Sequence, residues 1–533
     1  MLATASHEFQ DEFAAFLKRQ EKGHFDPYAE ARRLAQLYDN TACSLEEWGN
    51  EWAMRSHVDA FFLDRVFRVP AGRHRERADY FRQAAFSDGA NLDARRALRE
   101  YRRLAGLFNA EFSSFERKKF VNLSHEANKA MNLNSYLSLM GKSWWIRHRG
   151  NSLHLEQSFD DHADLVVPDT DFIITLDADS VLLNDYALQL VAVMKTPGNE
   201  RLAVVQTPYS AFPGTRNVLE RVAGATTDIQ YIVHQGFTHF GGTFWVGANA
   251  LIRRRALDDI VVQRTERGFP VTIYIQDRTV IEDSESSVDL IAKGWKLHNH
   301  PDRLAYSATP VDFGSLLIQR RRWANGGLII LPKLLRYVFA GPGMRAKLAE
   351  AFVRIHYLIS PATTSLAILV VLLLPFEEGL RSTWLPLAAA SYFLLYGRDL
   401  VRTGYKWRDL PRVYALNLLL VPVNLGGVLK SLQQARTGRK TAFGRTPKIS
   451  SRTSAPPLYI LGVLALLVGS VVSAVIGFAD EKWARFTFSL LNSIVFGYVV
   501  LRFIGLRECV EDALAHWPQI QTTVLRTLVY QRR

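Results

Sequence analysis

The stretch that decides the fold is residues 172–180, which read Phe-Ile-Ile-Thr-Leu-Asp-Ala-Asp-Ser. A run of β-branched and apolar residues that ends in two carboxylates one residue apart predicts a buried strand that delivers both acids to its C-terminal edge. Open α/β sheets bind ligands at this edge. Because side chains alternate across a strand, Asp177 and Asp179 point the same way and can converge on one divalent cation. The alternative is a solvated turn in which Asp179 or Ser180 caps the next helix, and the pattern alone does not decide between the two.

Composition divides the chain into two parts. It has 533 residues, of which 48% are hydrophobic, and a formal net charge of +13. Residues 1–345 mix charged and apolar positions as globular domains do, whereas the C-terminal third contains long apolar runs separated by short polar loops. The excess of Lys and Arg beside these runs follows the positive-inside rule, and no nucleic-acid-binding signature accompanies it. We therefore expect a lipid bilayer, and no nucleic acid, as a partner.

The first part of the chain is expected to be helical. Residues 1–118 are rich in Glu, Arg, Ala and Leu, with apolar positions at helical spacing. No basic and apolar leader follows Met1, so neither a signal peptide nor an N-terminal span is predicted. Residues 57–69 fit either a strand or a short buried helix. Two cysteines are too few for a disulfide framework or a cysteine-rich zinc site, which fits a reducing cytoplasmic location.

Residues 119–345 alternate strands and helices as an α/β domain does. Residues 119–123 predict a short strand and residues 126–137 a helix. Lys129 near the start of this helix could meet a phosphate, although a lysine there is more often solvated. A polar loop is expected over residues 144–171. Beyond the central strand, a helix and another strand are predicted over residues 185–194 and 202–208, and strand, helix and strand are the unit of a parallel sheet.

Three further segments carry polar or aromatic groups of interest. Residues 240–254 contain Gly242 and Thr243 among aromatic residues, which favours either a backbone that passes close to a ligand or a glycine-kinked core strand. Glu282 and Asp283 precede a helix predicted over residues 285–293, so that Asp283 or Ser284 could be its cap. Residues 319–323 read Gln-Arg-Arg-Arg-Trp, which fits either a phosphate clamp beside a stacking platform or a juxtamembrane basic cluster.

Three motifs thus stand in order along the chain: Asp177-x-Asp179, Glu282-Asp283 and Gln319-x-x-Arg322-Trp323. In this order and at these offsets, and followed by apolar runs, they resemble the signature of processive family 2 glycosyltransferases of the cellulose synthase and hyaluronan synthase type. The similarity covers residues 119–505 and includes Gly242-Thr243, Gly294-Trp295 and Thr446-Pro447-Lys448. It implies a GT-A-type nucleotide-sugar transferase domain over residues 119–345, with a parallel-rich sheet and helices on both faces, followed by an α-helical transmembrane region.

The resemblance also implies an activity and its site. The reaction would be an inverting transfer of a hexose from a UDP-sugar, with UDP-glucose the expected donor, to a growing β-linked polysaccharide. Asp177 and Asp179 would hold the diphosphate through Mg²⁺ or Mn²⁺, with Asp179 as the expected direct ligand. Asp283, with Glu282 beside it, would be the general base that takes a proton from the acceptor hydroxyl.

The remaining site assignments also follow from the family. Gln319, Arg322 and Trp323 would line the acceptor end, with Trp323 under a sugar ring and Arg322 near the diphosphate. Further candidate substrate-lining residues are Gly242, Thr243 and Lys129. The partners would be the UDP-sugar donor, the glycan acceptor and accessory polysaccharide-export subunits.

The chain departs from the family in two places. Ile281 stands where the family has a threonine before the Glu-Asp pair. Family members also begin their nucleotide fold with a strand ending in an aspartate that reads the uracil, and Asp59 and Asp64 do not sit in such a turn. Residues 1–118 are then a diverged remnant of the first part of the transferase domain, or the sequence starts downstream of the true start. The alternatives are a non-processive glycosyltransferase acting on a lipid or short acceptor, and a catalytically silent membrane scaffold.

Residues 346–505 are expected to form a membrane domain. A span needs about 20 apolar residues, and four segments approach that length: residues 355–376, 384–401, 458–478 and 486–504. Residues 413–432 lie between two basic loops that should both be cytoplasmic, so we expect an interfacial or re-entrant segment there, with a fifth crossing as the alternative.

This topology predicts an integral protein of the inner (plasma) membrane. Its catalytic domain and its C-terminal tail, residues 506–533, would both be cytoplasmic. The basic loop at residues 440–448 would be either a lid over the site or an ordinary positive-inside loop.

Overall fold

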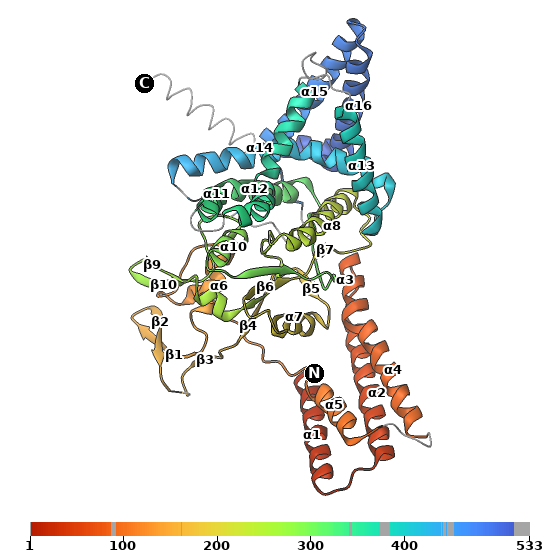
Figure 1. Cartoon of the computed structure of the whole chain (residues 1–533), viewed down its shortest axis with the longest axis vertical. Coiled ribbons are helices and arrows are strands. Elements are labelled where there is room, and N and C mark those ends of the chain that lie inside the picture. The colour runs from red at the N-terminus through yellow and green to blue at the C-terminus, as the bar shows by residue number, and fades with distance from the viewer. Residues whose placement is uncertain are drawn as a thin grey trace. The chain divides into compact units, whose positions relative to one another are not determined.

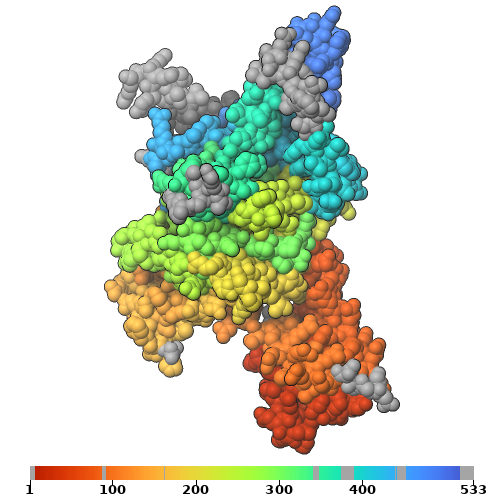
Figure 2. Space-filling model, in the orientation of Figure 1, coloured from red at the N-terminus to blue at the C-terminus, as the bar shows by residue number. Residues whose placement is uncertain are grey.

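The computed structural model describes residues 2–86, 92–160, 162–339, 344–373, 384–438, 440, 444 and 452–515. The chain divides into two compact units, Met1–Glu116 and Arg117–Arg533. Figure 1 shows the units as ribbons, and Figure 2 shows their surfaces in the same colours. The predicted loop at residues 440–448 lies outside the described residues except for Lys440 and Gly444, and so do the motif Thr446-Pro447-Lys448 and most of the C-terminal tail.

The N-terminal unit consists of helices around an apolar core. Its core contains Phe16, Leu34 and Phe81, and α2 begins at Pro27 behind Asp26, whose side chain accepts a hydrogen bond from the N–H of Tyr28 at 3.0 Å. Residues 57–69, which the sequence left undecided, are helical. The helices are α1 (Leu2–Glu21), α2 (Pro27–Glu51), α3 (His57–Phe62), the π-helical turn η1 (Leu63–Arg68), α4 (Val69–Ala84) and α5 (Ala94–Ala105).

Two buried carboxylates join the helices of this unit. Glu30 on α2 accepts a hydrogen bond from the hydroxyl of Tyr101 on α5 at 2.7 Å. Glu100 on α5 accepts one from the hydroxyl of Tyr38 on α2 at 2.6 Å and another from Nε of Arg77 on α4 at 2.8 Å. The exchange between α2 and α5 is therefore reciprocal, with each helix supplying one carboxylate and one phenol.

The second unit contains an antiparallel sheet where a polar loop was predicted. In this sheet β1 (Lys142–Arg149) pairs with β2 (Ser152–Ser158) and with β3 (Leu165–Val167). Most of the side chains on β1 and β2 are exposed or half-buried, so their sequence carries no clear alternation. The strand predicted over residues 119–123 is also wrong, because this segment forms the 3₁₀ turn η2 (Arg117–Lys119) and a single bridge from Phe120 to Leu153.

The central sheet has four strands in the order β11-β6-β8-β4. β8 runs antiparallel to both of its neighbours, β6 and β4, and β11 runs parallel to β6. The predicted α/β class is confirmed, but the sheet is mixed rather than parallel-rich because β8 lies between the two strands that α7 connects. The elements are β4 (Phe172–Leu176), α7 (Tyr186–Lys195), β6 (Leu202–Gln206), β8 (Asn249–Arg253) and β11 (Lys296–Asn299).

Helices cover both faces of this sheet (Figure 1). Val205 and Leu251 pack against Tyr186 of α7 on one face. Val204 and Ile252, which point the other way, pack with residues of α9 (Arg254–Asp258), α10 (Glu282–Ala292) and α11 (Phe313–Phe339). This alternation is what the two-residue period of a buried strand produces.

Shorter elements complete the catalytic region. α6 (Lys129–Leu137) is capped by Asn128, whose side chain accepts from the N–H of Met131 at 2.8 Å. The smaller sheets have the orders β5-β12-β7 and β10-β9. The remaining bounds are β5 (Ser180–Leu182), β7 (Tyr209–Ala211), α8 (Val218–His239), β9 (Val262–Glu266), β10 (Phe269–Ile273) and β12 (Ala305–Ser307).

The last part of the second unit is helical. Within the described ranges, four helical segments are long and apolar enough to cross a membrane: Lys347–Leu373, Trp407–Thr437, Pro457–Ala479 and Trp483–Ile504. The elements are α12 (Met344–Leu373), α13 (Trp384–Arg402), η4 (Trp407–Asp409), α14 (Leu410–Thr437), α15 (Pro457–Ala479), α16 (Trp483–Val499) and η5 (Val500–Ile504).

The set of candidate spans differs from the prediction at two helices. The predicted span at residues 384–401 forms α13, which is not among the four and carries Arg398, Asp399 and Arg402. Residues 413–432 lie inside α14, which continues through Pro422 without a break. An unbroken helix is compatible with an interfacial segment as well as with a fifth crossing, so the interfacial or re-entrant segment at residues 413–432 stays a prediction.

Candidate active site

Asp177 and Asp179 lie in the turn that joins β4 to β5. Because β5 begins at Ser180 and α7 begins only at Tyr186, neither aspartate caps a helix, and that alternative is excluded. The N–H of Asp177 donates to the carbonyl oxygen of Ala248 at 3.1 Å, which extends the pairing of β4 with β8 by one residue. The Asp177 side chain is 40% exposed, so its carboxylate is open to a ligand.

Lys129 connects this turn to the loop before β8. Its ammonium group donates to the carboxylate of Asp177 and, at 2.5 Å, to the carbonyl oxygen of Gly247. Its side chain is 24% exposed. Lys129 is thus an ion-pair partner at the strand end and not a solvated lysine, which sets a fixed positive charge beside Asp177.

Asp283 lies on the first turn of α10 and faces the same loop. Its carboxylate accepts hydrogen bonds from the backbone N–H of Gly247 and, at 2.6 Å, from that of Ser284. A Cβ atom on Gly247 would lie 2.5 Å from Oδ2 of Asp283, so any larger residue at this position would displace the Asp283 carboxylate. A chain of contacts therefore runs from Asp177 through Lys129 and Gly247 to Asp283 and brings two of the three motifs together.

Burial sets the acid–base properties of the Glu282–Asp283 pair. Burial raises the pKa of Asp283 above its ordinary value, although the N–H groups of Ser284 and Gly247 and the charges of Lys129 and Arg322 oppose the rise. Burial and the neighbouring Asp283 carboxylate likewise raise the pKa of Glu282, which is 9% exposed. Asp283 can therefore take up a proton more readily than an exposed aspartate can.

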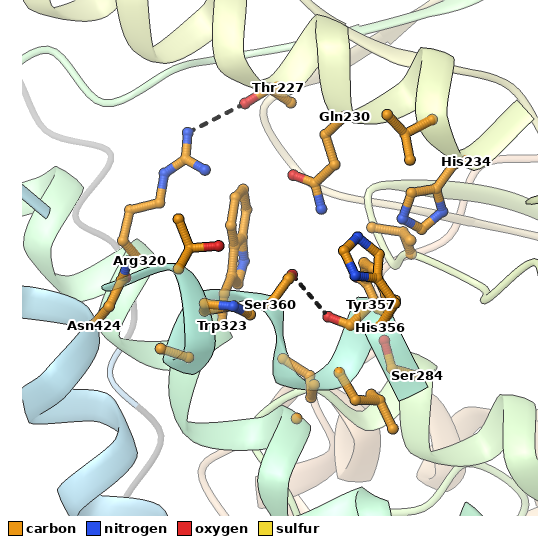
Figure 3. A pocket seen from close by; sticks show the side chains of 18 of the residues that line it. Thr227, Gln230, His234, Ser284, Arg320, Trp323, His356, Tyr357, Ser360 and Asn424 are labelled. Atoms are coloured by element: carbon orange, nitrogen blue, oxygen red, sulfur yellow. Dashed lines mark hydrogen bonds between the residues drawn. The ribbon is translucent and has the colours of Figure 1, made fainter. Parts of the chain in front are cut away.

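The third motif lies on α11, and part of it borders a cavity of about 320 Å³. Trp323 and Arg320 line this cavity together with Asp283, and the Arg320 guanidinium lies 4.5 Å from the centre of the Trp323 ring. Figure 3 shows Arg320 and Trp323 side by side, with Arg320 donating to Thr227 on α8. Gln319 is buried in α11, at 8% exposure.

Gly242 and Thr243 do not belong to the lining of this cavity. Thr243 is completely buried, and its hydroxyl is 2.7 Å from that of Thr238. A Cβ atom on Gly242 would lie 2.6 Å from a methyl group of Val353, so this glycine permits close packing against α12. The two residues pack the loop before β8 against its neighbours, and their place in a substrate lining stays a prediction.

The turn between β4 and β5 fits a metal ion that is shared with a substrate. Across the described ranges, no group of three or more His, Cys, Asp or Glu side chains forms a closed metal cluster. Mg²⁺ commonly takes only one or two protein carboxylates and completes its shell with phosphate oxygens and water. Asp177 and Asp179 supply two carboxylates of this kind at an exposed turn, beside the ammonium group of Lys129.

Sequence reasoning missed several residues of the site. Gly247 lies in residues 240–254, the segment that was selected for Gly242 and Thr243. Only the structure shows that Gly247 contacts Asp283. Tyr231 and His234 line the cavity from α8. Their spacing along an amphipathic helix is the signal that could have placed them on one face, although it does not show which face borders a cavity.

Comparisons with known proteins agree with the sequence motifs. Residues 172–397 match the model of glycosyl transferase family group 2. A cellulose synthase catalytic subunit from Dictyostelium discoideum is 28% identical over 162 residues, which are 30% of this chain and 14% of that protein. The catalytic subunit of cellulose synthase from Komagataeibacter sucrofermentans is 27% identical over 168 residues, which are 29% of this chain and 19% of that protein. The chain thus spans less than a fifth of the length of either relative.

Among solved structures, a mannosyltransferase from Pyrobaculum calidifontis in complex with GDP-Man and Mn2+ is similar over 51% of this chain and 70% of its own length. The sequence identity is 14% and the TM-score is 0.28.

Proposed function

We propose that this chain, whose residues 172–397 match the model of glycosyl transferase family group 2 and which is similar to cellulose synthase catalytic subunits, transfers a hexose from a UDP-sugar to a growing β-linked polysaccharide at a membrane. UDP-glucose is the donor that the similarity favours. The observation that carries the proposal is the chain of contacts from Asp177 through Lys129 and Gly247 to Asp283. It connects a group suited to a diphosphate with a group suited to a proton transfer.

The donor end of the site would be the turn after β4. Asp177 and Asp179 would hold the UDP diphosphate together with Mg²⁺ or Mn²⁺, which neutralises charge on the leaving diphosphate when it is bound. Asp179 would be the direct ligand, because Lys129 already contacts one oxygen of Asp177. The Lys129 ammonium would also face the diphosphate, as a second fixed positive charge.

The acceptor end would be the cavity beside Asp283. Asp283 would take the proton of the acceptor hydroxyl while that oxygen attacks the anomeric carbon and UDP leaves from the opposite face, which inverts the anomeric configuration. The N–H groups of Gly247 and Ser284 would hold its carboxylate in position, with Glu282 beside it. Trp323 would stack on a sugar ring, and the other two residues of its motif would contact the diphosphate and the acceptor: Arg322 and Gln319.

The cavity also suggests a direction for the product. Its lining continues from Asp283 to Pro361 and Thr364 on α12 and to Asn417 and Asn424 on α14. Both helices are among those apolar enough to cross a membrane. We therefore expect the glycan to leave between them, with the catalytic unit on the cytoplasmic face of the inner membrane and accessory export subunits as partners beyond it.

The test uses membranes that contain the full chain. They would receive a panel of labelled UDP-sugars with Mg²⁺ or Mn²⁺, and the product would be sized. We expect long product from one donor, loss of transfer after chelation with EDTA, and recovery when either metal is restored. Short products alone would favour a non-processive transferase, and transfer that persists at full rate in EDTA would contradict the metal assignment.

One observation favours a second candidate, a catalytically silent membrane scaffold. β4 is an edge strand of the central sheet, and within the described part of the chain no strand pairs with its outer edge. Ile174 and Leu176 on this strand are 39% and 38% exposed. A sheet edge of this kind is normally covered, and an uncovered edge favours an incomplete donor site. Calorimetric titration with UDP and Mn²⁺ separates the candidates, because a silent scaffold would bind no UDP.

A further inference from the structure

One face of α8 forms a polar wall of the cavity beside Asp283. This α8 wall consists of Thr227, Gln230, Tyr231 and His234. These residues recur every three or four positions, so their side chains share one side of the helix. Figure 3 shows Gln230 and His234 extending from α8 into the space on which Trp323 also borders.

Several groups in this wall have no hydrogen-bond partner among the described residues. His234 is 1% exposed, and neither of its ring nitrogens has a partner. Tyr231 is 5% exposed, and its hydroxyl has none either. The same is true of Nε of Arg320, next to Trp323. Buried polar side chains in native proteins are nearly always hydrogen-bonded, so this grouping around one cavity indicates a polar ligand.

The chemistry of the wall selects the kind of ligand. Burial lowers the pKa of His234 to about 4, so its imidazole is neutral at ordinary pH and offers one N–H donor and one nitrogen acceptor. Burial raises the pKa of Tyr231 well above its usual value, so its phenol keeps its proton. The wall therefore presents uncharged donors and acceptors. These suit the hydroxyl groups of a neutral sugar, while the charged side chains that line the cavity, Arg320 and Asp283, lie outside this wall.

The surroundings fix the position of the imidazole. The ring of His234 lies 4.7 Å from that of Tyr357 and 5.5 Å from that of Phe237, measured between centres. The backbone carbonyl of His234 accepts a hydrogen bond from Asn299 at 2.8 Å, which holds this turn of α8 against β11. Tyr231 is held in a similar way, with its ring 5.6 Å from that of Tyr209. A ligand would meet groups that are already in place, so little ordering is needed on binding.

We propose that Tyr231 and His234 bind the acceptor, by hydrogen bonds to the hydroxyl groups of a neutral pyranose that stacks on Trp323. The assignment rests on the proposed transferase function and adds the class of acceptor sugar and the residues that orient it. The two residues hold the ring so that one hydroxyl faces Asp283.

The experiment measures binding directly, on the full chain in lipid nanodiscs. Isothermal titration calorimetry would follow the binding of a β-1,4-linked glucose trisaccharide and, separately, of UDP with Mn²⁺. Tyr231→Phe removes the hydroxyl and keeps the shape of the ring. His234→Phe removes both nitrogens, and His234→Gln restores one donor and one acceptor. His239→Phe, at the exposed end of the same helix, is the matched control.

We expect losses of trisaccharide affinity that follow the hydrogen bonds removed. The dissociation constant should rise about threefold to tenfold in Tyr231→Phe and about tenfold or more in His234→Phe. His234→Gln should recover part of the loss, and His239→Phe should match the wild type. UDP affinity should be unchanged in all of them. In transfer assays the KM for the acceptor should rise more than kcat falls.

Two results would overturn the proposal, and both can be distinguished from a result that overturns the transferase function itself. One is a wild-type chain that binds the trisaccharide and UDP while Tyr231→Phe and His234→Phe bind both equally well. The other is a wild type that prefers a β-1,4-linked glucuronate trisaccharide to the glucose trisaccharide. A wild type that binds neither trisaccharide nor UDP would instead remove the proposed function on which this assignment rests.

Discussion

Two regions of this molecule contain buried carboxylates whose pKa values are shifted in opposite directions. In the N-terminal unit, burial would raise the pKa of Glu100, but hydrogen bonds from Arg77 and Tyr38 outweigh it and lower the pKa below its usual value. At the candidate active site, burial raises the pKa of Asp283, and its two backbone N–H partners do not offset it. The difference is the presence or absence of a direct cationic partner.

This contrast separates a structural carboxylate from a reactive one. Glu100 remains ionised and connects α5 to α2 and α4 by hydrogen bonds. These contacts stabilise the unit only while the carboxylate keeps its charge. Asp283 is held by neutral N–H groups, while the nearby Lys129 ammonium pairs with Asp177 instead. A carboxylate that is buried, positioned and incompletely compensated is what a general base requires.

The largest effect should come from removing the base itself. Asp283→Asn keeps the size of the side chain and an oxygen that can accept from Gly247, but it cannot take a proton. Transfer of labelled sugar should fall by about 10²–10⁴-fold, while UDP binding measured by calorimetry should be unchanged. Glu100→Gln in the same membranes serves as the control. Wild-type turnover in Asp283→Asn would end the assignment of Asp283.

The next-largest effect should come from moving the Asp283 carboxylate while Asp283 itself is kept. In Gly247→Ala the new methyl group would lie 2.5 Å from the Asp283 carboxylate and must displace it. A shift of about 1 Å in a catalytic group can cost about 100-fold in rate, so we expect a loss of that order in transfer with little change in UDP affinity.

Gly236→Ala is the matched control for this variant, because a Cβ atom there would meet nothing within 4 Å. It lies inside α8, where alanine is the better helix former, so the fold should be kept or slightly stabilised. Equal transfer rates in Gly247→Ala and Gly236→Ala would show that the contact with Asp283 is not needed.

The site illustrates how far the sequence leads. The strand β4 and the helix α10 could be predicted, because a run of β-branched residues and an amphipathic segment leave local signals. The helix begins at Glu282 and not after the Glu282–Asp283 pair, so Asp283 lies in its first turn and is not its cap. Lys129 could not be assigned, because its contact with Asp177 joins residues far apart in the chain and depends on how α6 is placed. The same holds for Gly247, whose role is visible only from the position of a side chain on another element.

The fold shows the same limit. Strand, helix and strand from β4 to β6 were read correctly, but no local pattern indicates that β8 inserts between them and makes the sheet mixed. β1 and β2 were missed because neither of their faces is deeply buried, so their sequence lacks the alternation that marks a half-buried strand.

A smaller effect is expected on the structural side of the comparison. Glu100→Gln keeps the hydrogen bond with Tyr38 but loses the charge that pairs with Arg77. A hydrogen bond to a charged group contributes about 1.5–3 kcal/mol, so the free energy of opening of α2 and α5 should fall by about 2 kcal/mol. Amide hydrogen exchange of the full chain measures this locally. A change of less than about 0.5 kcal/mol would show that Glu100 does not hold these helices together.

The smallest and most general test uses pH, because the two carboxylates should respond in different ranges. The raised pKa of Asp283 means that transfer is lost as pH falls while the solution is still above the ordinary aspartate value of about 3.9. The lowered pKa of Glu100 means that its contribution to stability is complete above the unfolded glutamate value of about 4.3 and is lost only as pH falls further, through the folded pKa. Transfer rates at fixed Mn²⁺ and hydrogen exchange in α2 and α5, both measured across this range, should therefore separate: activity declines first, with the N-terminal helices still protected. Loss of protection in α2 and α5 at a pH where transfer is still at its maximum would contradict this comparison. It would mean that Glu100 takes up its proton at a higher pH than Asp283 does.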